Sequence, residues 1–194
     1  MKFQNAAIAV VATFLGLLAE AEALSIKVQG EVVAILDVQF EYDQQQDLGG
    51  EELVLSDTTV ELNGNIWKAL RILDNGTGID IHEDTILKFD FDLQEAAELE
   101  AICLDENLEL SDLKVDANDV RRCFVVANEQ GWVHDMINVP DMVEEDETRS
   151  YEIPVGHFFT GTVNYLVFIQ DNDEDRSFGK SSFSNIDIVD DEVS

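Results

Sequence analysis

A tryptophan with polar neighbours is the first feature of this sequence that could carry out binding chemistry. Trp132 lies in the turn-rich stretch NEQGWVHD, together with His134 and Asp135. An exposed indole ring stacks on the apolar face of a pyranose, while imidazole and carboxylate groups hydrogen-bond to its hydroxyls. These three residues are therefore candidates for contacting a bound carbohydrate. Trp67 is a further candidate, although its apolar neighbours in IWKALRI favour a place in the core.

A second feature is a short acidic run that follows an apolar segment. Its three aspartates occupy alternate positions of the sequence DNDED: Asp171, Asp173 and Asp175. Oxygen ligands at alternate loop positions are typical of Ca²⁺ sites, so Ca²⁺ is the expected cofactor. The run is not an EF-hand, because Arg176 and Ser182 stand where that loop requires Gly and Glu. The alternative is a polar turn in an acidic chain. Asp105 and Glu106 are weaker candidates for the same edge.

Two cysteines and one glycosylation motif suit an exported protein. Cys103 and Cys123 form an even pair, which in an oxidising compartment most simply forms one disulfide. Asn75 begins the sequence Asn-Gly-Thr, an acceptor site for N-linked glycans in a turn-like stretch.

Catalytic motifs are missing from the sequence. It contains no G-x-S-x-G elbow, no H-E-x-x-H and no glycine-rich phosphate loop. The three histidines, His82, His134 and His157, are scattered along the chain. The chain is therefore not expected to be an enzyme. A glycosidase that uses two carboxylates stays open, because so many acidic residues offer numerous pairs.

The charge of the chain restricts its partners. Among 194 residues, 42 are Asp or Glu and 11 are Lys or Arg, which gives a formal net charge of −31. Binding to nucleic acid requires basic patches, so nucleic acid is not an expected partner. The acidic composition suits either a solvated surface in saline surroundings or the binding of divalent cations.

The N-terminus has the features of a cleaved secretory signal peptide, predicted over residues 1–23. Met1 and Lys2 provide a basic start, Ala6–Leu18 is apolar, and Ala21–Ala23 has the small-x-small pattern of a cleavage site. Thirteen apolar residues are too few to span a bilayer, so no membrane insertion is expected. The sequence therefore predicts a secreted protein, with a lead-in strand region over 24–41 and one domain over 42–194.

Short apolar runs separated by turn residues recur along this domain, which is the pattern of an all-β fold. In residues 86–93, ILKFDFDL, apolar and polar side chains alternate cleanly. Further strands are predicted in these segments: 32–40, 53–55, 59–62, 66–72, 123–127, 151–155, 165–170 and 183–189. The stretch LDNGTGIDIHED between 73 and 84 is predicted to be a loop. Residues 94–102, QEAAELEAI, are strong helix formers, and propensity alone predicts a helix there.

Five sequence blocks resemble a family of extracellular carbohydrate-binding-module-like β-sandwich domains, found in secreted polysaccharide-associated proteins of marine microbes. The resemblance runs from about Tyr42 to the end of the chain. The blocks are ELNGNIWKAL (61–70), TILKFDFDL (85–93), ELEAICLDEN (98–107), YEIPVGHFFTGTVNYLVFIQDND (151–173) and SFSNIDIVD (182–190). The acidic stretch 108–143 departs from the family pattern.

This resemblance implies a single antiparallel β-sandwich of jelly-roll type, in which residues 98–104 form a strand despite their helix propensity. It implies a secreted, non-catalytic module whose partner is a polysaccharide or other glycan. Two other functions stay open: an acidic matrix or adhesion protein, and a small hydrolase that acts on glycans.

Overall fold

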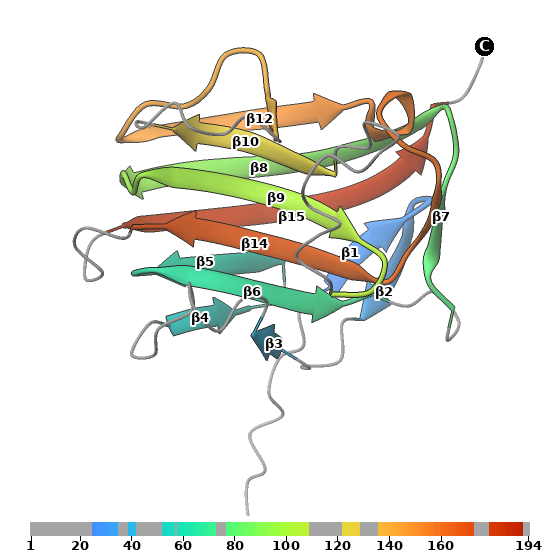
Figure 1. The fold of residues 1–194 in the computed structure, drawn as a ribbon, viewed down its shortest axis with the longest axis horizontal. Helices are drawn as coiled ribbons and strands as arrows, with labels where there is room; N and C mark the ends of the chain where they lie inside the picture. The colour runs from blue at the N-terminus through green and yellow to red at the C-terminus, as the bar shows by residue number, and fades with distance from the viewer. Residues whose placement is uncertain are drawn as a thin grey trace, which may run out of the picture.

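The computed structural model describes residues 25–34, 39–41, 52–56, 58–72, 77–108, 122–128, 136–172 and 179–191. Over these ranges two large β-sheets pack face to face, with a separate pair of short strands at one end (Figure 1). The predicted all-β sandwich is therefore confirmed. No helix in this described part of the chain has the length and apolar character needed to cross a membrane.

The first sheet has seven strands, and the last strand of the chain lies inside it. Its members are β12 (Glu147–Ile153), β8 (Thr85–Glu95), β15 (Lys180–Asp190), β1 (Ser25–Val28), β2 (Glu31–Ala34), β5 (Thr59–Asn63) and β4 (Glu52–Leu55). Along one side β15 pairs with β8. Along the other side it pairs first with β5, antiparallel, and then with β1, parallel. The partner changes at a bulge between Ser184 and Asp187, where Asn185 has a φ of 53°.

The second sheet has six strands in the order β11-β10-β9-β14-β6-β3. These strands are β11 (Ile137–Asn138), β10 (Cys123–Asn128), β9 (Leu99–Asp105), β14 (Tyr165–Asp171), β6 (Ile66–Arg71) and β3 (Gln39–Glu41). The remaining pair is β7 (Ile79–Ile81) with β13 (Gly161–Val163). From β5 onward the chain crosses repeatedly between the two large sheets, which gives the predicted jelly-roll arrangement.

The space between the sheets is filled by apolar side chains from alternate strand positions. On β8 the pattern places Leu87, Phe89, Phe91 and Leu93 in the interior, because neighbouring strand residues point to opposite faces. Phe183 of β15 lies at the centre of an aromatic cluster. Its ring centroid is 4.7 Å from Phe91, 5.6 Å from Phe89 and 5.3 Å from Phe168 of the facing sheet.

Cys103 of β9 and Cys123 of β10 are direct cross-strand partners and form the predicted disulfide. They lie in a second apolar cluster, on the face of the six-stranded sheet that points away from the sandwich interior. We call this the outer cluster. Its members are Trp67, Ala69, Leu99, Ala101, Cys103, Cys123, Val125, Val167 and Ile169. All of them are buried, so this sheet has apolar side chains packed on both faces.

The structure corrects several predictions of local structure. The helix that propensity alone predicts over 94–102 is wrong, and the strand that the resemblance implies over 98–104 is confirmed, because β8 extends to Glu95 and β9 begins at Leu99. The loop predicted over 73–84 contains β7, whose strand pairing depends on the distant β13. The strand predicted over 151–155 ends at Ile153, and Val155–His157 form a 3₁₀ turn labelled η2. Residues 32–40 are divided between β2 and β3.

Candidate functional site

A groove lies along β12, the edge strand of the seven-stranded sheet, opposite the segment that runs from β11 to Met142. It encloses a cavity of about 360 Å³. A volume of this size is within the range of small-ligand sites. The lining residues come from β11 and the segment after it, from β12 and from η2: Ile137, Val139, Pro140, Asp141, Arg149, Ser150, Tyr151, Glu152, Ile153, Pro154 and Phe158.

The apolar surface of the groove is centred on Phe158. This side chain is 39% exposed, while Val32, Val54 and Met142 are the other large apolar side chains found exposed in the described residues. The Phe158 ring meets Phe124 of the six-stranded sheet edge-on, with ring centroids 5.5 Å apart and an interplanar angle of 66°. The ring is therefore held in a fixed position while part of its surface faces solvent.

Both prolines of the chain, Pro140 and Pro154, line this groove, and both are exposed. Proline has no backbone N–H to donate to a sheet, so Pro154 directly after β12 helps to end the strand there. The backbone then turns into η2, where the N–H of Phe158 donates to the carbonyl of Val155 at 3.0 Å. This local turn is what brings Phe158 to the groove.

The opposite wall of the groove is anchored to β10. The N–H groups of Val139 and Val143 donate to the carbonyls of Val125 and Val126 at 3.0 and 2.9 Å. The side chains of Val139 and Val143 are only 5% exposed. Buried side chains and paired backbone groups therefore fix this wall against the six-stranded sheet.

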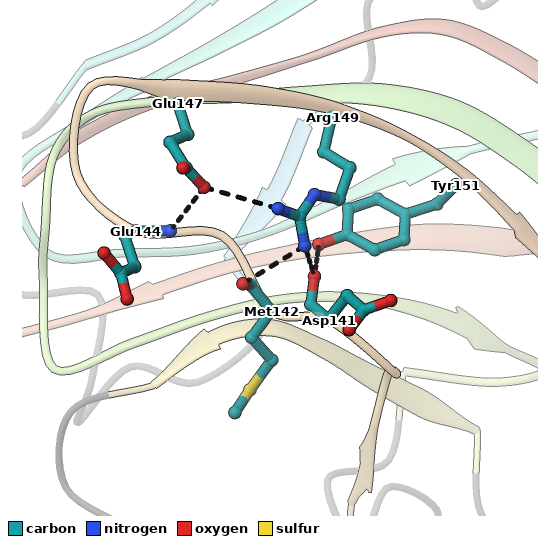
Figure 2. A network of polar contacts seen from close by, with 6 residues as sticks. All are labelled: Asp141, Met142, Glu144, Glu147, Arg149 and Tyr151. Carbon is teal, nitrogen blue, oxygen red and sulfur yellow. Dashed lines mark hydrogen bonds and ion pairs between the residues drawn. The ribbon is translucent and has the colours of Figure 1, made fainter.

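Arg149 and Tyr151 of β12 cross the groove toward the same wall (Figure 2). Arg149 donates to the carbonyl oxygens of Asp141 and Met142, and its guanidinium lies 3.4 Å from a carboxylate oxygen of Glu147. The hydroxyl of Tyr151 donates to the same Asp141 carbonyl at 3.1 Å. These contacts hold the two sides of the groove together.

The phenol of Tyr151 stays protonated over the whole physiological pH range. Burial, the larger cause, raises its pKa to about 12, and the nearby acidic groups of Asp141 and Glu147 act in the same direction. Arg149 acts in the opposite direction but does not reverse the shift. The tyrosine is therefore a hydrogen-bond donor to the wall at neutral pH.

A second cavity, of about 400 Å³, lies on the other side of η2. It is lined by Glu83, Asp84, Ile86, Pro154, His157 and Asp191. Since Pro154 lines both cavities, the two are neighbours across this residue. We call the first the aromatic groove and the second the acidic pocket.

A glycine fixes η2 between the two cavities. A Cβ atom on Gly156 would come within 1.9 Å of the backbone oxygen of His82 and 2.6 Å of the backbone of Glu83. Only glycine allows so close an approach of the two backbones. Gly156 therefore places the turn that carries His157 and Phe158 directly against the loop that carries Glu83.

Some of the candidate residues from the sequence lie outside the described residues, and the others lie within them. Trp132, His134 and Asp135 lie outside the described residues, as do Asp173, Asp175 and Asn75. Trp67 is only 5% exposed and belongs to the outer cluster. Its indole Nε1 donates to a carboxylate oxygen of Asp171 at 3.1 Å. Trp67 is therefore a core residue and not an exposed platform, because apolar neighbours surround its ring.

The aspartates of β9 and β14 do not come together at one edge as expected. Asp171 is fully buried and pairs with Leu99 at the start of β9, whereas Asp105 at the end of β9 pairs with Tyr165. Because the strands are antiparallel, the two carboxylates lie at opposite ends of the sheet. Asp105 instead accepts hydrogen bonds from the N–H groups of Glu106 and Leu108, at 2.7 and 3.0 Å.

Sequence reasoning did not identify Phe158, Pro140 or Pro154 as site residues. The two prolines could have pointed to these positions, because they are the only prolines of the sequence and each comes soon after a strand. In the sequence HFFTG, however, nothing distinguishes the exposed Phe158 from Phe159, which is only 6% exposed.

Comparison with known proteins gives structural neighbours only. No protein-family model matches the chain, and no curated protein matches it. One similar solved structure is a family 30 carbohydrate-binding module, with 15% identity and a TM-score of 0.42 over 79% of this chain and 99% of that one. Another was solved with a xylogluco-oligosaccharide, with 10% identity and a TM-score of 0.43 over 89% of this chain and 40% of that one. A third contains two domains named C and D, with 12% identity and a TM-score of 0.42 over 86% of this chain and 74% of that one.

Proposed function

We propose that this protein is a secreted, non-catalytic module that binds a carbohydrate chain in the aromatic groove. The observation that carries the proposal is the exposed ring of Phe158 beside Pro154 in a cavity whose walls are fixed by hydrogen bonds. An aromatic ring stacks on the C–H face of a sugar, and the surrounding polar groups determine which hydroxyl pattern fits.

The polar groups on the groove suit hydroxyl-rich ligands. Ser150 and Glu152 are exposed on β12, and Asp141 is exposed on the opposite wall. Carboxylates and hydroxyls accept hydrogen bonds from sugar hydroxyl groups. Trp132, His134 and Asp135 precede β11 directly in the sequence, and we include them in the proposal as further contacts.

A ring-removal experiment tests the role of Phe158. We expect Phe158→Ala to weaken binding to a retained polysaccharide about tenfold or more, a loss of about 1.4 kcal/mol, because a central aromatic contact dominates such sites. Phe158→Tyr keeps the stacking surface and should bind with nearly the original affinity. The measurement is affinity electrophoresis against a panel of soluble polysaccharides, followed by calorimetric titration with the ligand found.

Val54→Ala is the matched control, since it removes another exposed apolar side chain, 38% exposed, from a strand outside the groove. Thermal unfolding of each variant shows whether loss of the contact with Phe124 has unfolded the site. Equal binding by folded Phe158→Ala, Val54→Ala and the original protein would contradict the proposal. If no polysaccharide is retained at all, the acidic matrix or adhesion function becomes the better assignment.

Calcium is a further part of the proposal, as a stabilising ion bound near Asp171 with Asp173 and Asp175. A ligand that binds only the folded state stabilises it by RT ln(1 + [L]/Kd), so millimolar Ca²⁺ should raise the melting temperature. Differential scanning fluorimetry with Ca²⁺, Mg²⁺ and NaCl at equal ionic strength measures this effect. An equal rise with all three salts would show that the salts only screen the charge repulsion within a chain of net charge −31, without specific binding of Ca²⁺.

A further inference from the structure

We infer that the aromatic groove receives the end of a sugar chain and excludes the chain interior, because the groove is closed at one of its two ends. The inference rests on the proposed binding of a carbohydrate in this groove, and it specifies which part of the carbohydrate enters. It follows from the way in which the two walls of the groove are connected.

The two walls of the groove are consecutive parts of the chain. One wall ends at Met142, the other begins with β12 at Glu147, and a tight turn joins them. In this turn the N–H of Glu147 donates to the carbonyl of Glu144 at 3.2 Å, and the N–H of Asp146 donates to a carbonyl of β8 at 2.8 Å. The backbone itself therefore closes the groove here, and the turn is fixed to the seven-stranded sheet. We call this the closed end.

Side chains of β12 hold the two walls together next to the closed end (Figure 2). Arg149 donates to the carbonyls of Asp141 and Met142, and Tyr151 donates to the same Asp141 carbonyl. Asp141 has a φ of 57°, in the left-handed region that residues other than glycine rarely adopt. The two donors on its carbonyl stabilise this conformation, so the walls separate here only if these hydrogen bonds are lost.

The opposite end of the groove is open, because the Phe158 ring that borders it is partly exposed to solvent. Between Arg149 and Ile153 the strand β12 rises about 13 Å, which is the length of about two or three sugar rings. A chain that stacks on Phe158 and continues inward reaches the closed end after this distance. The interior of a long chain continues in both directions and would collide with the turn.

The closed end also has hydrogen-bonding groups that suit a terminal sugar. The side chain of Arg149 is 35% exposed, and its contacts within the described residues use three of its five N–H donors. The exposed Asp141 lines the groove beside it. A terminal sugar carries a free hydroxyl where an interior sugar carries a glycosidic oxygen. The hydroxyl can accept from Arg149 and donate to a carboxylate, whereas a glycosidic oxygen can only accept.

The test compares the same polysaccharide at two chain lengths. A soluble mixed-linkage β-glucan, an arabinoxylan and a galactomannan are each titrated calorimetrically, intact and after sonication, which shortens the chains without changing the sugar units. Chains that are about tenfold shorter have about tenfold more ends per gram, so half-saturation of the protein should require about tenfold less polysaccharide by mass. A groove that binds chain interiors would require the same mass of both preparations.

A substitution at the closed end tests the same inference from the side of the protein. Arg149→Ala should weaken the binding of sonicated chains about tenfold, because a hydrogen bond from a charged donor is lost. Arg149→Lys keeps a charged donor and should recover part of this loss. Arg71→Ala is the matched control, since Arg71 is an exposed arginine at the end of β6, outside the groove. Equal binding by folded Arg149→Ala and Arg71→Ala would contradict the role of the closed end.

The possible outcomes separate this inference from the proposed function. Equal half-saturating masses of intact and sonicated chains, with loss of binding in Phe158→Ala, would overturn the chain-end inference and leave carbohydrate binding in the groove intact. A preference for sonicated chains that persists at full affinity in Phe158→Ala would place the site outside the groove and overturn both. Failure to bind any of the three polysaccharides, intact or sonicated, would also overturn both.

Discussion

Replacing Phe183 with alanine is expected to lower the free energy of unfolding by about 3–5 kcal/mol, the largest effect of any substitution discussed for this protein. The side chain is fully buried and lies among three other phenylalanine rings, those of Phe89, Phe91 and Phe168. Phe168 belongs to the opposite sheet, so the ring joins the two layers of the sandwich. Its removal would leave a cavity that the rigid sheets can fill only partly.

Urea denaturation followed by tryptophan fluorescence measures this change. Phe183→Leu should cost less than half as much as Phe183→Ala, because most of the apolar volume is retained. Val54→Ala, at an exposed position, should change stability by no more than about 0.5 kcal/mol. A loss below about 1.5 kcal/mol for Phe183→Ala would show that the aromatic cluster does not hold the sheets together in solution.

Loss of the Cys103–Cys123 disulfide is expected to destabilise the folded protein by about 3 kcal/mol. The bond closes a loop with a sequence separation of 20 residues, and in the chain-entropy model a loop of this length contributes about that much. The effect arises in the unfolded chain, which regains freedom when the link is absent. The native pairing of β9 with β10 should persist, since backbone hydrogen bonds hold the same two strands together.

The double variant Cys103→Ala, Cys123→Ala, compared with the original protein with and without reductant, measures this contribution. The double substitution, and the addition of reductant to the original protein, should lower the urea denaturation midpoint by similar amounts. In the variant itself, reductant should have no effect. A midpoint unchanged by the double substitution would show that the 20-residue loop is already constrained in the unfolded chain.

The strands were predictable where one face of the sheet is buried and the other is exposed. In residues 85–95 the alternation of side chains identifies both the strand and the face that enters the core, because side-chain direction in a strand repeats every two residues. The same rule fails for β9, whose seven residues are all buried. A strand that is covered on both faces shows no alternation, so local propensity wrongly favours a helix there, and only the resemblance of the sequence blocks predicted the strand.

Glu100 illustrates how tertiary contacts override that propensity. Its side chain is fully buried within β9, and one carboxylate oxygen accepts a hydrogen bond from the N–H of Ala97 at 2.7 Å. This contact turns the chain between β8 and β9. In an isolated peptide the segment QEAAELEAI would favour a helix. Pairing on both sides, with β10 and β14, favours the strand in the folded protein.

The candidate site was not predictable, because its parts are distant in sequence. The acidic pocket combines Glu83 and Asp84 with Asp191, and the aromatic groove combines Asp141 with Tyr151 and Phe158. Each residue has an ordinary sequence context. Their proximity depends on the order of strands in the sheets and on the close approach at Gly156, neither of which is encoded in a short motif.

The central position of β15 has a consequence for how the protein folds. This strand follows all the others in the chain, yet β8, β5 and β1 each pair with it and it joins them into one sheet. A nascent chain whose residues 180–190 are not yet synthesised lacks the middle strand of its larger sheet. Contacts so distant in sequence also make folding slow. The larger sheet can therefore be completed only after this last strand has been synthesised, so its folding is post-translational.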